Sequence, residues 1–231
     1  MATLKVLGAG PVKRGVTQLA EKFEKTSGHR VSVEFAGAPS VRERVLAGEA
    51  VDVAIVPQAT MDEFAQQGRI VTGARGLVGR SRMGIVVRKG APLPDIPAVE
   101  DFKRAVMNAD EIVCNVASSG VYMVKLLEKL GIGEAMKDKI LKLPNTVKVM
   151  EHVAGSAARA IGVGQLAEIS ELVDKGLAIA LVAPLPDAIQ NVTAYDAAVA
   201  GASASKDAAA ELAGFLTGSE ARAVFAATGI D

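Results

Sequence analysis

Short apolar runs alternate with helical patterns through the first third of the chain. Thr3–Leu7, Val31–Phe35 and Val51–Val56 are typical of strands, and the third is apolar enough to be buried on both faces. Apolar residues recur at helical spacing after each run, and Gly28 stands where the first helix should end. Because strands and helices alternate in this way, the sequence predicts a mostly parallel sheet covered by helices.

The pattern changes after about residue 75. Gly76–Arg88 is a long extended segment, and a second alternation of strands and helices follows it to about residue 184. Val192–Val199 then resembles another strand. We therefore expect an α/β fold of two lobes, one formed by residues 1–82 plus 185–231 and the other by the inserted residues 83–184.

The second alternation also gives specific element boundaries. It predicts strands at Glu111–Val116, Ala158–Val163 and Gly176–Val182. It predicts helices at Val99–Met107, Ser119–Leu130, Glu134–Ile140 and Val147–Ala154, and the chain ends in two helices, Asp207–Leu216 and Ser219–Ala227.

Composition narrows the class of function. The chain has 231 residues, 26 basic and 26 acidic side chains, and only 3% aromatic residues. It therefore lacks the positive field and the stacking platforms of nucleic-acid binders. A single cysteine, Cys114, excludes an internal disulfide, and with only His29 and His152 beside it we expect no metal site.

The sequence leaves the compartment open. No apolar run reaches the length of a membrane span, and no secretory signal pattern precedes the first strand. Either the protein stays in the cytoplasm with Met1 as its native start, or it works in the periplasm after removal of a signal.

The first turn between strand and helix is the glycine-rich Gly8-Ala9-Gly10, followed by Pro11. A tight turn with proline at the first helical position explains it without a ligand. The alternative is that the bare backbone lets a ligand approach the N–H groups of a helix N-terminus, where anions bind. No third glycine is in register, so the turn is not a dinucleotide fingerprint, and we expect no cofactor.

Hydroxyl residues mark other helix starts. Ser40 and Thr60 each precede a glutamate by three residues, so we expect both to cap helices through capping boxes. Ser40, next to Pro39, is also a candidate ligand contact. Ser118 and Ser119 precede Gly120 at another helix start, where they either cap the helix or hold an oxyanion.

Arginines gather on the long extended segment. Arg80 and Arg82 are two residues apart, so they point to the same side of a strand. One alternative is a solvated edge strand whose charges oppose aggregation. The other is a crossing strand whose arginines meet a carboxylate ligand. Arg75 and Arg88 belong to the same set. No catalytic Ser-His-Asp or Cys-His arrangement accompanies them.

Several stretches together resemble extracellular solute-binding proteins of the molybdate-binding type. They are LKVLGAG, LAEKFEKTSGHRVSVEFAGAPSVRERVLAGEAVDVAIVPQATMDEFAQQGRI, ASSGVY, IGVGQLAEI and FLTGSEARAVFAATGI. The resemblance implies the type II periplasmic binding fold, with two three-layer lobes joined by crossing hinge strands. It also implies a monomer that closes on a small anion held in the cleft between the lobes and then docks on the permease of an ABC transporter.

The resemblance also implies which loops hold the ligand. They fall at Gly10, at Pro39 and Ser40, at Ser119, at Val147 and at Gln165. Gly10 stands where molybdate binders have a serine and Gln165 where they have a tyrosine, so the ligand is either an oxyanion or an organic carboxylate. The candidate ligand contacts are Gly8, Ala9, Gly10, Pro39, Ser40, Arg80, Arg82, Ser118, Ser119, Val147 and Gln165.

Two other functions stay open. Similar proteins include aconitate isomerases, whose chemistry needs a positioned base and cationic clamps. Glu151, Glu168 and His152 are the candidate bases here. A cytoplasmic ligand sensor is the third alternative, which the absence of a signal favours.

Overall fold

A computed structural model describes residues 1–231 and divides the chain into two compact units. Unit 1 is Met1–Ser81 with Thr193–Asp231, and unit 2 is Arg82–Val192. Unit 1 therefore resumes at Thr193 rather than at the expected residue 185. The reason is that the segment before Thr193 belongs to unit 2, where the Gln190 amide bonds the backbone of Met83.

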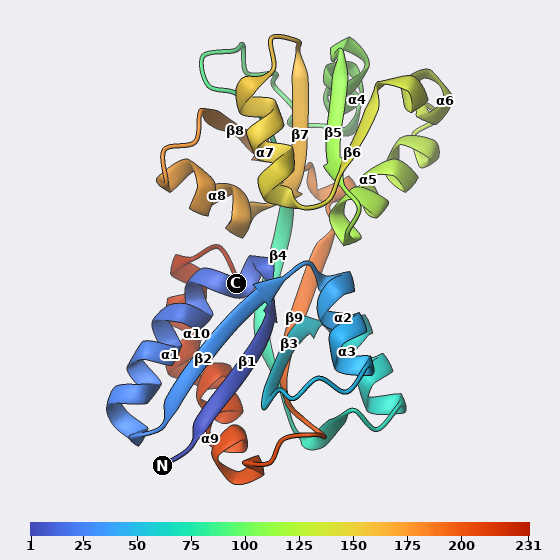
Figure 1. The fold of residues 1–231 in the computed structure, drawn as a ribbon. Coiled ribbons are helices and arrows are strands. Elements are labelled where there is room, and N and C mark those ends of the chain that lie inside the picture. The colour runs from blue at the N-terminus through green and yellow to red at the C-terminus, as the bar shows by residue number, and fades with distance from the viewer. The chain divides into compact units, whose positions relative to one another are not determined.

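Unit 1 is built on a sheet in the order β2 (Arg30–Ala36), β1 (Thr3–Ala9), β3 (Val53–Pro57) and β9 (Val192–Ala200) (Figure 1). The first three strands are parallel and β9 is antiparallel to β3. Pairing of Ala9 with Ala36 brings the carboxyl ends of β1 and β2 to the same edge. The helices are η1 (Gly10–Val12), α1 (Lys13–Ser27), α2 (Ala38–Leu46), α3 (Gln58–Gln66), α9 (Lys206–Thr217) and α10 (Ser219–Ala227).

Helices of unit 1 lie on both faces of this sheet (Figure 1). The contacting helices α1, α9 and α10 form one layer, and α2 and α3 pack on the strands from the other side. Leu7, Val56 and Phe64 are fully buried in the cluster under α2 and α3. Each helix of the first alternation ends at a left-handed glycine, with φ of 73° at Gly28.

Unit 2 has a sheet of its own. Parallel strands β6 (Ile140–Leu143), β5 (Glu111–Asn115) and β7 (Ala160–Gln165) lie side by side, and β7 is antiparallel to β4 (Ile70–Arg88), which begins in unit 1. Strand β8 (Ile179–Pro184) pairs with the other edge of β4. The helices are α4 (Val99–Asn108), α5 (Ser118–Lys129), α6 (Gly133–Met136), η2 (Lys137–Lys139), α7 (Thr146–Gly155), α8 (Leu166–Asp174) and η3 (Asp187–Ile189).

Alternate residues of the unit 2 strands enter two different cores. Ile85 and Cys114 lie in the cluster that includes Phe102 of α4 and residues of α5. Val86 and Val113 lie in the cluster of α7 and α8 on the other face. A sheet buried on both faces explains the nearly continuous apolar runs of its strands. No helix of the chain is long and apolar enough to span a bilayer.

Two elements of unit 2 were not expected from the sequence. Strand β6 has only the four residues ILKL, and its first residue lay in an expected helix, Glu134–Ile140. Helix α8 follows β7 at once, with no glycine, proline or serine between them to mark its start. Short elements without boundary residues give weak sequence signals.

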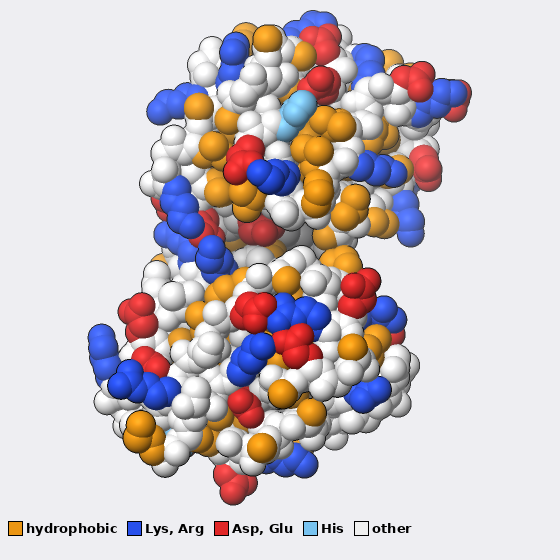
Figure 2. Space-filling model, in the orientation of Figure 1, with side chains coloured by type: hydrophobic (Ala, Val, Ile, Leu, Met, Phe, Trp, Pro, Cys, Tyr) orange, Lys and Arg blue, Asp and Glu red, His pale blue; other side chains and the backbone are white.

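An ion-pair cluster ties β1, β2 and α2 of unit 1 together. Glu49 accepts hydrogen bonds from Arg44 at 2.5 and 2.6 Å and from Lys5 at 2.7 Å, while Glu34 contacts both cations. Figure 2 shows acidic and basic side chains mixed on this face of unit 1. The hydrogen bonds from Arg44 and then Lys5 lower the pKa of Glu49 from 4.5 to about 2.

We expect this cluster to make stability depend on pH in acid. Because the pKa of Glu49 is lower in the folded state, its stabilisation is complete above pH 4.5 and is lost as the pH falls towards 2. The difference in unfolding free energy between the wild type and Glu49→Gln should therefore shrink between pH 5 and pH 2. Urea denaturation at several pH values measures it, and Arg44→Gln should behave alike. A difference that stays constant with pH would contradict this assignment.

Candidate functional site

The first glycine turn lies at the carboxyl end of β1. Gly8 is buried, and a Cβ there would stand 3.0 Å from the ring of Phe35, so a side chain at this position would require that ring to shift. Ala9 is the N-cap of η1 and Pro11 follows in its first turn, with no side-chain cap. Gly10 is half-buried. The backbone N–H groups at this helix start therefore meet no capping side chain.

The capping boxes expected at Ser40 and Thr60 are wrong. Helix α2 starts at Ala38 with Gly37 as N-cap, and α3 starts at Gln58 with Pro57 as N-cap. Pro39 lies in the first turn of α2 and favours this early start, because its fixed φ suits a helix and its missing N–H is not needed there. Ser40 consequently lies inside the first turn, exposed at the same sheet edge as Gly10.

A buried carboxylate lies opposite the carboxyl end of β3 in unit 1. Asp196 of β9 is 3% exposed, and it accepts hydrogen bonds from Arg75 at 2.7 Å and from Gln58 at 3.0 Å. Arg75 also contacts Asp62 at 2.7 Å. Burial lowers the pKa of Arg75, but the bonds to Asp196 and Asp62 outweigh burial and leave that pKa raised. The positive charge of Arg75 is therefore balanced by carboxylates of the protein itself. The sequence did not indicate this role.

The arginines expected on one side of the crossing strand are both exposed. Arg80 and Arg82 flank the fully buried Ser81 on β4. Arg82 lies 3.4 Å from Asp187, an exposed carboxylate. The backbone of Arg80 pairs with Asp231, which fixes the strand without using the guanidinium.

In unit 2, Asn115 joins the ends of two parallel strands. Its amide nitrogen donates to the hydroxyls of Ser119 and Thr146, both at 3.1 Å. Its amide oxygen accepts from the backbone N–H groups of Ala117 at 2.9 Å and Gly120 at 3.2 Å. Since the three side chains are at most 4% exposed, this network fixes the starts of α5 and α7 relative to each other.

Two helices of unit 2 begin around this network, and asparagine side chains accept from one first-turn N–H group of each. Ala117 is the N-cap of α5 and offers no side chain, so neither Ser118 nor Ser119 caps the helix. Ser118 is exposed and Ser119 is buried. Helix α7 is capped by Asn145, whose side chain accepts from the N–H of Lys148 at 3.0 Å. The first-turn N–H groups of both helices have no acceptor within their helix.

The remaining expected contacts lie beside the same network. Val147 is 44% exposed in the first turn of α7. Gln165, at the end of β7, is the buried N-cap position of α8. Glu168 in the first turn of α8 accepts a hydrogen bond from Thr146 at 2.8 Å, which links a third helix start to the network. Among the other candidate bases, His152 contacts Glu111 and Glu151 contacts Lys148.

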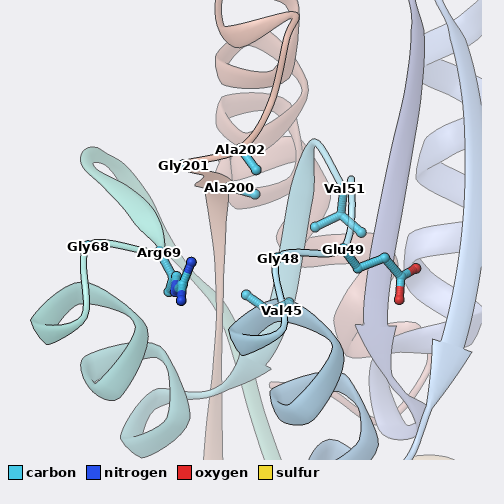
Figure 3. A pocket seen from close by; sticks show the side chains of 9 residues that line it. All are labelled: Val45, Gly48, Glu49, Val51, Gly68, Arg69, Ala200, Gly201 and Ala202. Atoms are coloured by element: carbon cyan, nitrogen blue, oxygen red, sulfur yellow. The ribbon is translucent and has the colours of Figure 1, made fainter.

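A separate cavity of about 220 Å³ lies elsewhere in unit 1. Figure 3 shows that Arg69 points towards it whereas the carboxylate of Glu49 points away. It is bordered by the segment between α2 and β3 and by the ends of α2, α3 and β9, so it lies away from the carboxyl ends of the parallel strands. Its lining residues are Val45, Gly48, Glu49, Val51, Gly68, Arg69, Ala200, Gly201 and Ala202.

Ligands of open α/β sheets bind beyond the carboxyl ends of parallel strands, and each unit has helix starts at that edge of its own sheet. Comparison with known proteins defines the family. The model of the bacterial extracellular solute-binding protein family matches residues 4–231. The chain therefore belongs to the bacterial extracellular solute-binding proteins and is a solute-binding protein with a two-unit α/β fold of the periplasmic binding type.

Individual relatives differ in what they bind or do. The chain is 27% identical to the aconitate isomerase of a Pseudomonas species over 232 residues, which cover 96% of this chain and 84% of the isomerase. The Azotobacter vinelandii periplasmic molybdate-binding protein has a TM-score of 0.77 at 17% identity, over 99% of this chain and 98% of that one. The Mycobacterium tuberculosis sulfate-binding protein has a TM-score of 0.78 at 14% identity, over 100% and 86%.

Proposed function

We propose that this solute-binding protein takes up a small anion and delivers it, as a periplasmic monomer, to the permease of an ABC transporter. The ligand, an oxyanion or an organic carboxylate, would contact helix starts at the carboxyl ends of the parallel strands. The supporting observation is that these helix starts carry first-turn N–H groups with no acceptor in their helix and no anionic side-chain cap. Molybdate and sulfate are named for two proteins of the same fold.

The residues proposed to hold the anion follow from this placement. Gly8, Ala9 and Gly10 would present backbone N–H groups in unit 1, beside Pro39 and the exposed Ser40. Ser118, Ser119, Val147 and Gln165 would do the same in unit 2. Arg80 and Arg82 are exposed cations of β4 that would meet a carboxylate of the ligand.

Thermal denaturation with added anions tests the proposal. A ligand that binds only the folded protein, present at a hundred times its Kd, adds about 2.7 kcal/mol to the unfolding free energy. We therefore expect the Tm to rise by several degrees with one anion among molybdate, tungstate, sulfate and small di- and tricarboxylates. Sodium chloride at equal ionic strength is the control. If none of these anions raises the Tm above that control, the proposal fails.

An isomerase of an unsaturated polycarboxylate is the second candidate function. The 27% identity to an aconitate isomerase favours it, as does the position of Glu168. The Thr146 hydroxyl holds this carboxylate at 2.8 Å beside the unit 2 helix starts, where a general base would be needed. Incubation with cis- or trans-aconitate, followed by absorbance and chromatography, tests for turnover. Turnover that Glu168→Gln abolishes while binding persists would support the isomerase, and binding without turnover would exclude it for aconitate.

A further inference from the structure

Three exposed valines each directly follow a residue of the Asn115 network in the chain. Val116 is 55% exposed, Val121 48% and Val147 44%. Single exposed hydrophobic residues are normal on a protein surface, but a group of them at one place indicates a contact. We call these three side chains the valine rim.

The topology brings the valine rim to one edge of the sheet. Val116 follows Asn115 at the end of β5, and its N–H donates to Leu143 at the end of the neighbouring parallel strand β6. Val147 follows Thr146, which Asn115 bonds directly. Val121 follows Gly120, whose N–H donates to Asn115. Figure 2 shows hydrophobic side chains exposed on unit 2 over α7 and β6.

The hydroxyl groups of the network are already used within the protein. Thr146 donates its hydroxyl proton to Glu168 at 2.8 Å, and the Ser119 hydroxyl exchanges hydrogen bonds with the Asn115 amide at 3.1 and 3.3 Å. Of the hydroxyls at this edge, only that of Ser118 is exposed. Side chains also accept from the N–H groups of Gly120 and Lys148, so the donors proposed for a ligand are the N–H groups before them in the first turns of α5 and α7.

We infer that the ligand is an organic carboxylate whose hydrocarbon part packs against the valine rim. This inference rests on the proposed function, because it assumes that an anion binds at this edge. A carboxylate has two oxygens, which the N–H groups of one helix start can satisfy, whereas a tetrahedral oxyanion has four to satisfy. A bare oxyanion would also leave the three valines in water.

Isothermal titration with ligands of equal charge tests the inference. Succinate, 2-methylsuccinate and 2,2-dimethylsuccinate differ only in methyl groups, and molybdate and sulfate represent bare oxyanions. Each methyl group that packs on the rim should tighten Kd about fourfold, the factor for one buried CH₂. The heat-capacity change of binding should become more negative along the series. Both oxyanions should bind more weakly than dimethylsuccinate.

Substitution of the rim supplies the matched control. Val121→Thr keeps the side-chain shape but replaces a methyl group by a hydroxyl, so the gain in Kd per methyl group of the ligand should fall below twofold. Val173→Thr makes the same change at a valine that is 39% exposed near the C-terminus of α8, outside the valine rim. In this variant each methyl group of the ligand should still tighten Kd about fourfold. The Tm without ligand checks that both variants fold.

The outcomes separate this inference from the proposed function. If an oxyanion binds more tightly than all three succinates, the ligand class is wrong although anion binding stands. If the methyl steps persist in Val121→Thr, the valine rim does not contact the ligand, and the inference is overturned. If no anion of any kind binds, the proposed function itself fails.

Discussion

Gly120→Ala is expected to destabilise unit 2 by about 3 kcal/mol and to abolish anion binding. A Cβ on residue 120 would overlap the backbone carbonyl of Asn115, which cannot move away as a flexible side chain would. The N–H of Gly120 also donates to the Asn115 amide at 3.2 Å, so displacement of this helix start breaks the network around it. The change would therefore disturb both the packing of α5 and the donors of the proposed site.

The two tyrosines of the chain allow each unit to be followed separately. Tyr122 lies in unit 2 and Tyr195 in unit 1, and there is no tryptophan. Urea denaturation of Gly120→Ala in a Tyr195→Phe background would thus report on unit 2. Gly155→Ala, at the end of α7 in unit 2, is the control, because nothing lies within 4 Å of a Cβ there and a helix tolerates alanine better than glycine. Equal stability of Gly120→Ala and the wild type would contradict the close approach.

Local sequence patterns predicted the first strands and the ends of the first helices, but not the polar contacts between distant side chains. The apolar runs and the glycines after the helices placed β1, β2 and β3 and the ends of the helices that follow them, because both signals come from neighbours in sequence. The network around Asn115 depends on Thr146, which is 31 residues away. A single asparagine after an apolar strand carries no sign of that partner.

The same limit explains two errors about side chains. Arg75 was expected with the arginines of the extended segment, but its partner is Asp196, which is 121 residues away on β9. The Ser-x-x-Glu pattern at Ser40 fits a capping box, but Pro39 favours an earlier helix start, with Gly37 as N-cap. The glutamate of the pattern is therefore not at the third position of the helix, where a capping box needs it. A local pattern fails where another local signal or a distant charge competes with it.

Asp196→Ala is expected to lower the unfolding free energy of unit 1 by about 3 kcal/mol, which would be among the largest effects of a single substitution on that unit. The Asp196 side chain is 5% exposed and that of Arg75 23%, so removal of the carboxylate leaves a partly buried guanidinium with only the exposed Asp62 nearby. The Gln58 amide at the start of α3 also loses its acceptor. Tyrosine fluorescence during urea denaturation, in a Tyr122→Phe background, would measure the loss.

Two further variants distinguish the buried charge from the rest of the contact. Asp62→Ala removes the other partner of Arg75, but its side chain is 58% exposed, so the cost should stay below about 1 kcal/mol. Arg75→Met in the Asp196→Ala background removes the uncompensated charge and should restore most of the lost stability. If this double variant is no more stable than Asp196→Ala, the carboxylate stabilises unit 1 through Gln58 and α3 rather than through Arg75. If Asp62→Ala costs as much as Asp196→Ala, burial does not set the strength of either ion pair.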